Sequence, residues 1–384
     1  MISGNILVVD DDFGTREIIR HNVVEQGFLA SAVASGELAL EALKSGQFDL
    51  VLLDVLMPGL DGHEVLNRLK SDPDLQHIPV VMISGLDDIK IVVSCIEDGA
   101  EDFLTKPFDP TLLRARVRSC LEKKNLRDKE QDHLAAIEKV KLRLEQELNE
   151  ASNYVKSILP KPFEQDGLSI DWRYTPSTEL GGDIFGYAWI DSDSFAIYLL
   201  DVCGHGVGAS LLSVSVLNTI ASGEVSNIDF KNPSQVLAKL NFSFPMEKQN
   251  NMFFSMWYAV LDVPSGKLKY AGGGHPPALL IDHENQLIQL ESQGPIIGID
   301  EGVHFESQET TLKAGAQLYL YSDGVYEHVR DDGSTVDFDT FQDALLQSNL
   351  ENDSLSSLEN WARSIHSQPS FEDDFSIVKL SYKK

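Results

Sequence analysis

Cysteine is scarce in this 384-residue sequence, and the sequence contains neither a long apolar run nor a basic N-terminal segment. The three cysteines, Cys95, Cys120 and Cys203, are widely spaced and form no CxxC pair, which argues against a disulfide framework or a thiolate zinc site. No apolar run reaches the roughly 20 residues of a membrane-spanning helix. The first residues, MISGNILVVDDD, place acids after the apolar run, the reverse of a secretory signal. We therefore expect a soluble, cytoplasmic protein that does not contact a membrane.

Positive charge is also in short supply, with 31 lysines and arginines against 60 aspartates and glutamates and a formal net charge of −29. Such a chain repels a phosphate backbone, so direct nucleic-acid binding through a wide basic face is disfavoured. The sequence does contain 42% hydrophobic residues, enough for packed cores, over a length typical of two domains and a connector.

Short β-rich runs alternate with amphipathic segments over the first 121 residues. The runs lie at 6–9, 28–33, 50–54, 79–84 and 102–105. Five such units predict an α/β fold with a doubly wound parallel sheet. In this fold, functional side chains gather at the carboxyl ends of the strands.

From about 110 to 160 no β-rich run occurs, and the composition predicts one long helix that Pro160 and Pro162 end. Heptad spacing arranges its side chains in two rows: Leu134, Lys141, Leu148 and Val155, and Ile137, Leu144, Ala151 and Ile158. The rows predict a coiled-coil linker and a parallel homodimer. The alternative is that this stripe packs on the chain's own domains, and Lys141 interrupts one row.

Beyond Pro162 the pattern changes to longer β segments and hairpins, such as FFSMWYAVLD, a turn at PSG, and KLKYAGGG. Helical stretches are expected near 206–222 and 337–366. This pattern predicts an α+β domain. We place the domain boundaries at 1–121, 122–160 and 161–384.

Chemically active side chains fall at the predicted strand ends of the first domain: Asp10 and Asp11, then Asp54, Ser84 and Lys106. A carboxylate can accept a phosphoryl group when a divalent cation neutralises the crowded charge and a hydroxyl and a cation hold the transferred oxygens. Three neighbouring carboxylates repel one another, so the sequence predicts a Mg²⁺ ion here.

These residues stand in the motifs VVDD, LLDVLMPGLDG, ISG and KP, and the first domain resembles the receivers of CheY-type response regulators. The resemblance implies phosphorylation of Asp54 by a sensor histidine kinase. It implies that Mg²⁺ is bound by Asp11, Asp54 and the Leu56 carbonyl, with Asp10 assisting. Ser84 and Lys106 are implied to contact the phosphoryl oxygens, and Phe103 is implied to be the switch aromatic.

Four acidic motifs mark the second domain, GGD at 181–183, DVCGHG at 201–206, SDG at 322–324 and EDDFS at 372–376. Each lies at the end or the start of a β-rich run, and acids at strand ends can converge on one edge of a β-sandwich. Unpaired carboxylates are tolerated there only around cations, and oxygen ligands favour Mg²⁺ or Mn²⁺ over zinc. Two such ions can share a water, lower its pKa and direct it at a phosphate ester.

The acidic motifs, together with ILPKPF, WRYTPSTELGGD and GGGHPPALL, resemble PPM-type phosphatases of the RsbU and SpoIIE kind. The resemblance implies a site of two Mn²⁺ or Mg²⁺ ions, for which it supplies the ligands Asp183, Asp201, the Val202 carbonyl, Asp323 and Asp373. Asp374 is the alternative to Asp373, and we prefer Asp373 because it aligns with the metal-binding acid of the family. All four acids are present, whereas degenerate family members lack them.

Two positions depart from the family pattern, because Gly186 stands where a second acid is usual and Gly208 where proline is usual. Two histidines are less certain site residues. His205 lies in a tight glycine turn and His275 precedes two prolines, so turn structure or substrate contact is favoured over direct chemistry.

Taken together, the two resemblances imply a response regulator whose phosphorylated aspartate controls a metal-dependent serine/threonine protein phosphatase. The implied substrate is a phosphorylated STAS-domain protein that antagonises an anti-sigma factor in a partner-switching pathway. The alternative is a non-catalytic adaptor that binds and sequesters a protein partner.

Overall fold

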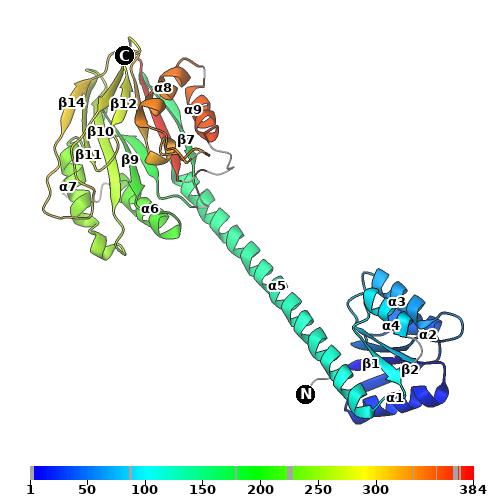
Figure 1. The fold of residues 1–384 in the computed structure, drawn as a ribbon. Helices are drawn as coiled ribbons and strands as arrows, with labels where there is room; N and C mark the ends of the chain where they lie inside the picture. The colour runs from blue at the N-terminus through cyan, green and yellow to red at the C-terminus, as the bar shows by residue number, and fades with distance from the viewer. Residues whose placement is uncertain are drawn as a thin grey trace. The chain divides into compact units, whose positions relative to one another are not determined.

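The computed structural model describes residues 4–85, 89–177, 180–222, 228–331, 333–351, 353–365, 371 and 373–384, except for the side chains of 89–92. Its internal contacts divide the chain into two compact units, Met1–Lys141 and Leu142–Lys384. Figure 1 labels the helices and strands of both units. Among the described helices, none has the length and apolar character required to span a membrane.

The first unit is built on a parallel sheet with strand order β2-β1-β3-β4-β5. Its strands are β1 (Asn5–Val9), β2 (Leu29–Val33), β3 (Leu50–Asp54), β4 (Val80–Gly85) and β5 (Asp102–Lys106). This order reverses direction at β1, as in doubly wound folds, and the five runs predicted from the sequence are confirmed within one residue at either end.

Alternate residues of these strands pack against helices on both faces of the sheet. Leu7 and Leu53 face one core, together with side chains of α2 (Gly36–Ser45), α3 (Gly62–Ser71) and α4 (Ile89–Glu97). Ile6 and Leu52 face the other core, with α1 (Phe13–Glu25) and the beginning of α5 (Pro110–Ile158). Burial on both faces explains why the central strands β1, β3 and β4 are continuous apolar runs, whereas the edge strands β2 and β5 are only partly buried.

The helix α5 is 49 residues long and ends two residues before Pro160, as predicted. Its first turns are tied to the start of β5, where Glu101 pairs with Lys123 and Arg127 and Asp102 pairs with Arg116. No break occurs at 121–122 in this described helix, so the predicted boundary there stays a prediction. The coiled-coil character of the helix also stays a prediction.

The second unit contains two antiparallel sheets, with strand orders β14-β11-β10-β9-β8 and β13-β12-β15-β16-β7-β6. The strands of the first sheet are β8 (Ile184–Trp189), β9 (Ser194–Val202), β10 (Phe254–Asp262), β11 (Lys267–Gly273) and β14 (Gln308–Thr311). Those of the second are β6 (Phe163–Gln165), β7 (Leu168–Thr175), β12 (Ala278–Ile281), β13 (Leu287–Leu290), β15 (Gln317–Tyr321) and β16 (Phe375–Tyr382).

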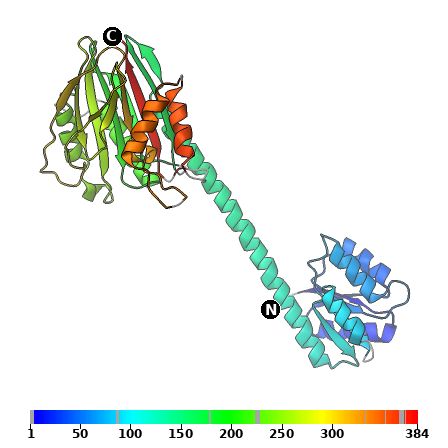
Figure 2. The same ribbon diagram turned by 45° about the horizontal axis from the view of Figure 1, so that its top comes forward.

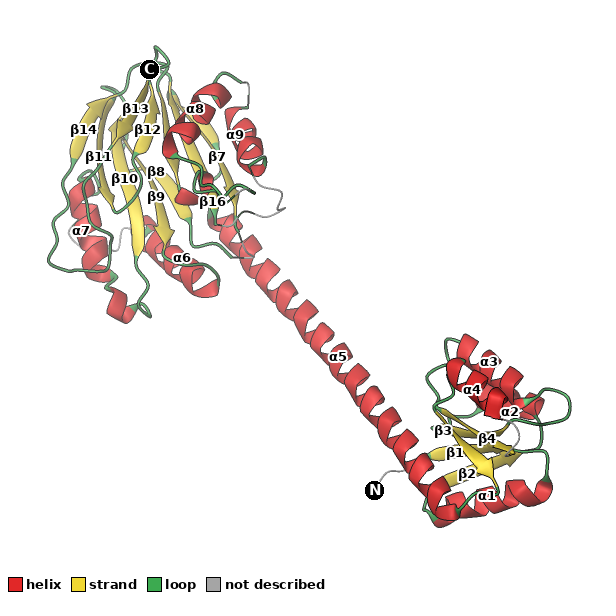
Figure 3. Cartoon of the chain, in the orientation of Figure 1, coloured by secondary structure: helices red, strands yellow, loops and turns green. Residues whose placement is uncertain are grey.

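Helices cover the outer faces of both sheets, as the two views in Figures 2 and 3 show. The first sheet packs on α6 (Val207–Ala221) and α7 (Pro233–Ser243), and the second on α8 (Phe338–Ser348) and α9 (Ser354–Arg363). Along β15, Leu318 and Leu320 face the core between the sheets, whereas Tyr319 and Tyr321 face α8 and α9. The predicted α+β sandwich is therefore confirmed.

The helices of the second unit were predicted less completely than its strands. The stretch near 206–222 is α6, and the stretch near 337–366 divides into α8 and α9. The helix α7 was not predicted, although Asn232 and Pro233 at its start are typical of a helix N-terminus.

Candidate functional sites

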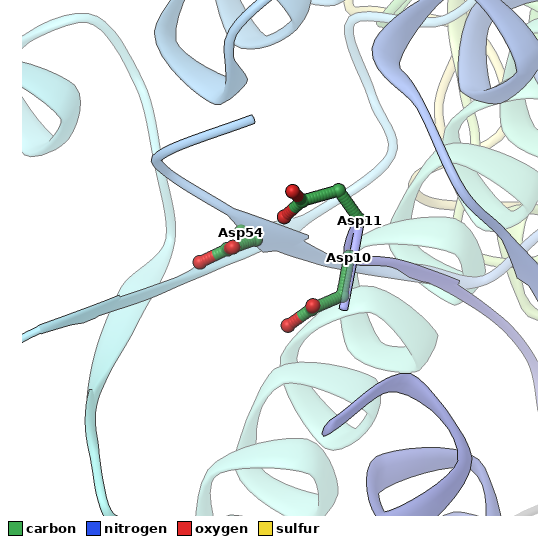
Figure 4. A group of neighbouring side chains, drawn as sticks. All are labelled: Asp10, Asp11 and Asp54. Carbon is green, nitrogen blue, oxygen red and sulfur yellow. The ribbon is translucent and has the colours of Figure 1, made fainter. Parts of the chain in front are cut away.

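The first candidate site lies at the carboxyl ends of β1 and β3. These strands are neighbours, with Val9 opposite Leu53, so that Asp10 and Asp54 lie side by side after them. Ligand oxygens of Asp10, Asp11 and Asp54 all lie within 4.8 Å of one another. Figure 4 shows these three side chains together at the strand ends. Such a set of hard oxygen donors suits Mg²⁺.

A lysine from β5 lies among these acids. The Nζ atom of Lys106 is 2.8 Å from Asp10 Oδ2 and 2.9 Å from Asp54 Oδ1. Burial raises the pKa of Asp54, the Lys106 ammonium opposes this increase, and the charges of Asp10 and Asp11 add to it. Burial alone lowers the pKa of Lys106, but its hydrogen bonds to Asp10 and Asp54 outweigh burial and raise it. The cluster therefore contains its own partial counter-ion.

Three further residues were predicted to belong to the receiver site. Ser84 is buried near the end of β4, where its hydroxyl donates to the Gly85 carbonyl at 3.4 Å. Leu56 lies two residues beyond Asp54 and is exposed, as is Phe103 on β5. Their roles stay predictions.

A glycine that the sequence reasoning did not single out positions Asp54. A Cβ atom at Gly62, the first residue of α3, would lie 2.0 Å from the Asp54 carbonyl oxygen. Only glycine lets α3 begin directly against the backbone of the phosphoacceptor candidate. The DG pair that ends LLDVLMPGLDG was the available signal.

The second candidate site lies at the ends of strands from both sheets of the second unit. Asp183 precedes β8 and Asp201 is near the end of its neighbour β9, in one sheet. Asp323 follows β15 in the 3-10 turn η2 (Asp323–Val325), and Asp373 precedes the neighbouring β16, in the other sheet. The four predicted acids thus come from two strand pairs.

Electrostatic interactions link these carboxylates in pairs, Asp183 with Asp201 and Asp201 with Asp323 and Asp373. Among the described residues, however, no three of them have ligand atoms within 4.8 Å of one another. Burial raises the pKa of Asp201 to about 7, with further increases from the charges of Asp323 and Asp373. Burial and the charge of Asp373 raise the pKa of Asp323 to about 6. Burial and the charge of Asp201 likewise raise the pKa of Asp183 well above its usual range. Mutual repulsion of this kind makes the ionised form of the carboxylates less favourable, and a cation bound among them would relieve it.

The most deeply buried acid also has an unused ligand atom. Asp183 is 1% exposed, and within the described part of the chain its Oδ2 atom has no hydrogen-bond partner. A buried carboxylate oxygen left without a donor is costly unless a cation binds it. The donor set, which contains only carboxylate and carbonyl oxygens, fits Mg²⁺ or Mn²⁺.

Gly182 allows two backbone segments of this site to pack closely against each other. A Cβ atom at Gly182 would lie 2.9 Å from the Val202 carbonyl oxygen and 3.0 Å from that of Gly204. The loop before Asp183 can therefore pack directly on the carbonyl that the sequence proposed as a metal ligand.

The adjacent acids Asp373 and Asp374 have different surroundings. The buried Asp374 carboxylate accepts hydrogen bonds from the backbone N–H groups of Gly182 (2.6 Å) and Ser177 (2.8 Å). Its oxygens are thus used to hold the GGD loop. Asp373 is instead exposed, and its charge raises the pKa values of Asp201 and Asp323, so it lies near these two acids. This arrangement supports Asp373 over Asp374 as a ligand, which stays a prediction.

Comparisons with known proteins match a different family model to each of the two units. The family model described as "Stage II sporulation protein E (SpoIIE)" matches residues 191–383, half of the chain. The chain belongs to the SpoIIE family. The matched region contains Asp201, Asp323 and Asp373, whereas Asp183 lies before it. The model of the response regulator receiver domain matches residues 6–118, so a receiver and a SpoIIE-family domain share one chain.

Individual relatives match one part each. The phosphoserine phosphatase RsbP of Bacillus subtilis is 30% identical over 49% of this chain and 47% of its own length. The response regulator PleD of Caulobacter vibrioides is 42% identical over 31% of this chain and 26% of its own length. The chain therefore covers about half or less of the length of each of these two relatives. The structure of the SiaA-PP2C domain of Pseudomonas aeruginosa, with a TM-score of 0.55 at 17% identity, covers 64% of this chain and 99% of that domain, which shows a shared fold.

The structure gives a physical reason for one departure from the SpoIIE-family pattern. Gly186 lies opposite Tyr198 across β8 and β9, and a Cβ atom at Gly186 would lie 2.4 Å from the Tyr198 ring. The phenol therefore occupies the space in which an acidic side chain would stand. At Gly208 a Cβ atom would approach Met252 Sδ no closer than 3.6 Å, so packing does not explain that departure.

The two uncertain histidines have different environments. His205 is exposed between Gly204 and Gly206, which both have positive φ. Burial raises the pKa of Asp373 and the charge of His205 opposes this increase, so the two side chains are near each other. His275 is buried, which lowers its pKa to about 4, and its Nδ1 atom is 3.0 Å from the Pro276 carbonyl oxygen. The structure gives no hydrogen bond or ion pair between His275 and the four acids among the described residues, so its role stays a prediction.

Proposed function

We propose that the second unit is a metal-dependent serine/threonine protein phosphatase. The observation that carries this proposal is the set of acids at neighbouring strand ends, in which Asp183, Asp201 and Asp323 have raised pKa values and the Oδ2 atom of the buried Asp183 has no partner among the described residues. The printed name of RsbP, a phosphoserine phosphatase, supports the same activity. The ions are Mg²⁺ or Mn²⁺, and two of them would supply positive charge and an acidified water at the phosphate ester.

The chain's own residues would position these ions and the phosphate. Asp183, Asp201, Asp323 and Asp373 are the proposed ligands, with the Val202 carbonyl as a further oxygen. Asp374 fixes the loop that contains Asp183 through its hydrogen bonds to Gly182 and Ser177. No side-chain nucleophile is required.

Hydrolysis of p-nitrophenyl phosphate and of a phosphoserine STAS-domain protein, with Mn²⁺ and with EDTA, tests the activity. Asp201→Asn should lower the Mn²⁺-dependent rate about 1000-fold, because loss of an ion removes several kcal/mol of charge stabilisation. The matched control is Asp193→Asn, which changes an exposed acid just before the opposite end of β9 and should keep the rate. A wild-type chain without any metal-dependent rate would favour the non-catalytic adaptor.

The first unit is proposed to regulate this activity through phosphorylation of Asp54 by a sensor histidine kinase. Mg²⁺ would be held by Asp11, Asp54 and the Leu56 carbonyl, with Asp10 assisting. Lys106 already contacts two of these carboxylates, so it is placed to hold a phosphoryl oxygen, and Ser84 and Phe103 have the roles that the sequence predicted.

The regulatory part is tested by comparing phosphatase rates of the full chain with and without beryllofluoride, a mimic of the acyl phosphate. The rate should change in the wild type and in Asp74→Asn, an exposed control, and should stay constant in Asp54→Asn. Equal rates with and without beryllofluoride in the wild type would remove the regulatory proposal.

A parallel homodimer through α5 is the third part of the proposal. Leu134, Ile137 and Leu144 on the predicted seam are 61%, 63% and 55% exposed, which leaves them free for a second copy. Val155 of the last heptad is instead buried within the second unit, so the seam available to a partner is shorter than predicted. Ile137→Glu should give a monomer in sedimentation equilibrium, whereas Lys139→Glu, on the opposite side of the heptad, should stay dimeric.

The proposed substrate is a phosphorylated STAS-domain protein in a partner-switching pathway. The support for this finer statement is the similarity to RsbP and the sequence motifs of the RsbU and SpoIIE kind. Dephosphorylation of a candidate STAS protein by the wild type but not by Asp201→Asn is the direct measurement. The domain boundaries at 121 and 160 are likewise proposed.

A further inference from the structure

A cavity of about 420 Å³ opens on the second unit. It is lined by the segment His275–Pro277, by Gln289, by residues 291–293 and by Tyr326 and Phe338. The Tyr321 hydroxyl donates to the Pro277 carbonyl at 2.6 Å, which fixes this segment against the end of β15. Leu279 lies opposite Tyr319, so Pro277 comes level with Tyr321 at the end of β15 that Asp323 follows.

Two buried polar atoms of the cavity lining have no partner. The Pro276 carbonyl can only accept, so the His275 ring must donate to it from Nδ1–H. The neutral ring, whose pKa burial lowers, then has an acceptor at Nε2, and within the described residues neither this atom nor Ser292 Oγ has a hydrogen-bond partner. A ligand that reaches the base of the cavity should therefore bring a hydrogen-bond donor.

The walls and rim of the cavity add two further preferences. The half-buried rings of Tyr326 and Phe338 lie edge to face at 5.2 Å and form an aromatic wall. Glu291 is an exposed acid on the rim, and none of the described lining residues carries a positive charge. The ligand should thus be cationic and able to stack on an aromatic ring.

We propose that this cavity binds an arginine side chain of the protein substrate, close in sequence to the phosphorylated residue. A guanidinium is planar, donates up to five hydrogen bonds and stacks on aromatic faces, whereas a lysine ammonium is a compact, strongly hydrated charge. The proposal rests on the phosphatase function, because it assigns the cavity as a specificity subsite of that reaction. His275 and Glu291 are then specificity residues that act outside the metal cluster.

Synthetic phosphoserine peptides test the subsite. In one series, a single arginine is moved through the positions on either side of the phosphoserine, and in a second series leucine replaces it. For the full chain with Mn²⁺, kcat/KM should favour arginine over leucine about tenfold at one or two positions, the ratio expected for one hydrogen bond to a charged group. His275→Phe, which keeps a ring without an acceptor, and Glu291→Gln should each reduce this ratio several-fold.

The matched control is Glu301→Gln, which neutralises an exposed acid outside the cavity and should keep the arginine preference. Equal kcat/KM for both series, or an undiminished preference in both cavity variants, would overturn the subsite and leave the phosphatase standing. Calorimetric binding of the same peptides separates the two proposals. Binding that prefers arginine without any hydrolysis would retain the subsite as a docking site and contradict the phosphatase.

Discussion

The two acidic sites of this chain balance their charge in different ways. In the receiver, Lys106 lies 2.8 Å and 2.9 Å from two of the three clustered carboxylates. In the SpoIIE-family domain, the charged groups that perturb Asp201 and Asp323 are all acids, and the pKa values rise to about 7 and about 6. The receiver site thus contains a built-in cation, whereas the proposed phosphatase site would take its positive charge from bound metal ions.

This difference matches what each proposed reaction requires. A receiver must be stable both with and without a phosphoryl group, and a lysine that pairs with the acids in one state can pair with phosphoryl oxygens in the other. A phosphatase site needs its ions in every turnover, so repulsion among empty carboxylates is a source of metal affinity. We therefore expect the two sites to respond in different ways to mutation, metal and pH.

The largest expected effect comes from removing the built-in cation. Lys106→Met leaves Asp10, which is fully buried, without its ion pair and should lower the unfolding free energy of the first unit by about 3 kcal/mol in EDTA. Mg²⁺ should recover part of the loss because it replaces the missing charge. Denaturant unfolding measures the effect, and hydrogen exchange of 50–54 assigns it to the receiver.

The control for this variant is Lys44→Met, which removes an exposed lysine from α2 and should change stability by less than about 0.5 kcal/mol. If Lys106→Met lost the same stability with Mg²⁺ as with EDTA, the lysine would act through packing and the contrast between the two sites would fail.

A smaller effect distinguishes the two adjacent acids of the phosphatase site. Asp374→Ala should cost about 2 kcal/mol of stability in EDTA, because the buried N–H groups of Gly182 and Ser177 lose their acceptor. Asp373→Ala should cost little or even stabilise the metal-free chain, because it removes repulsion, yet it should weaken Mn²⁺ binding. Thermal unfolding and calorimetric Mn²⁺ titration measure the two effects, and the reverse pattern would identify Asp374 as the ligand.

Much of this architecture could be predicted because it is encoded locally. The central receiver strands β1, β3 and β4 are continuous apolar runs buried on both faces, so their ends, and the acids after β1 and at the end of β3, follow from the pattern itself. The long helix was predicted for the same reason, since its composition is uniform and Pro160 marks its end. The helix α7 was missed because it is short and lies between polar loops, although Asn232 and Pro233 signalled its start.

Interactions between distant residues could not be predicted from the pattern. Lys106 is 96 residues from Asp10, and no periodicity indicates that it would contact two acids at once. Asp373 and Asp374 are neighbours, so spacing could not show that only Asp374 holds the GGD loop. The exclusion of an acid at position 186 depends on Tyr198, which is its partner only once β8 and β9 have paired.

The smallest expected effect is a difference in pH dependence. Burial and neighbouring acids raise the folded-state pKa of Asp201 from 3.8 to about 7, so the folded state holds this proton more tightly than the unfolded chain does. The resulting stabilisation is complete below about pH 4 and is lost as the pH rises through about 7. In EDTA, the second unit should therefore unfold about 3 °C lower at pH 8 than at pH 5.

Mn²⁺ should reverse this slope, because it binds the ionised carboxylates and competes with protons. Asp201→Asn should reduce the slope in EDTA, since the amide does not titrate, and Asp183 and Asp323, whose pKa values are also raised, should account for the remainder. Scanning calorimetry of the full chain across this pH range, with EDTA and with Mn²⁺, measures all three effects. A stability in EDTA that rose from pH 5 to pH 8 would mean that a positive group already neutralises the phosphatase acids, which would remove the contrast with Lys106 in the receiver.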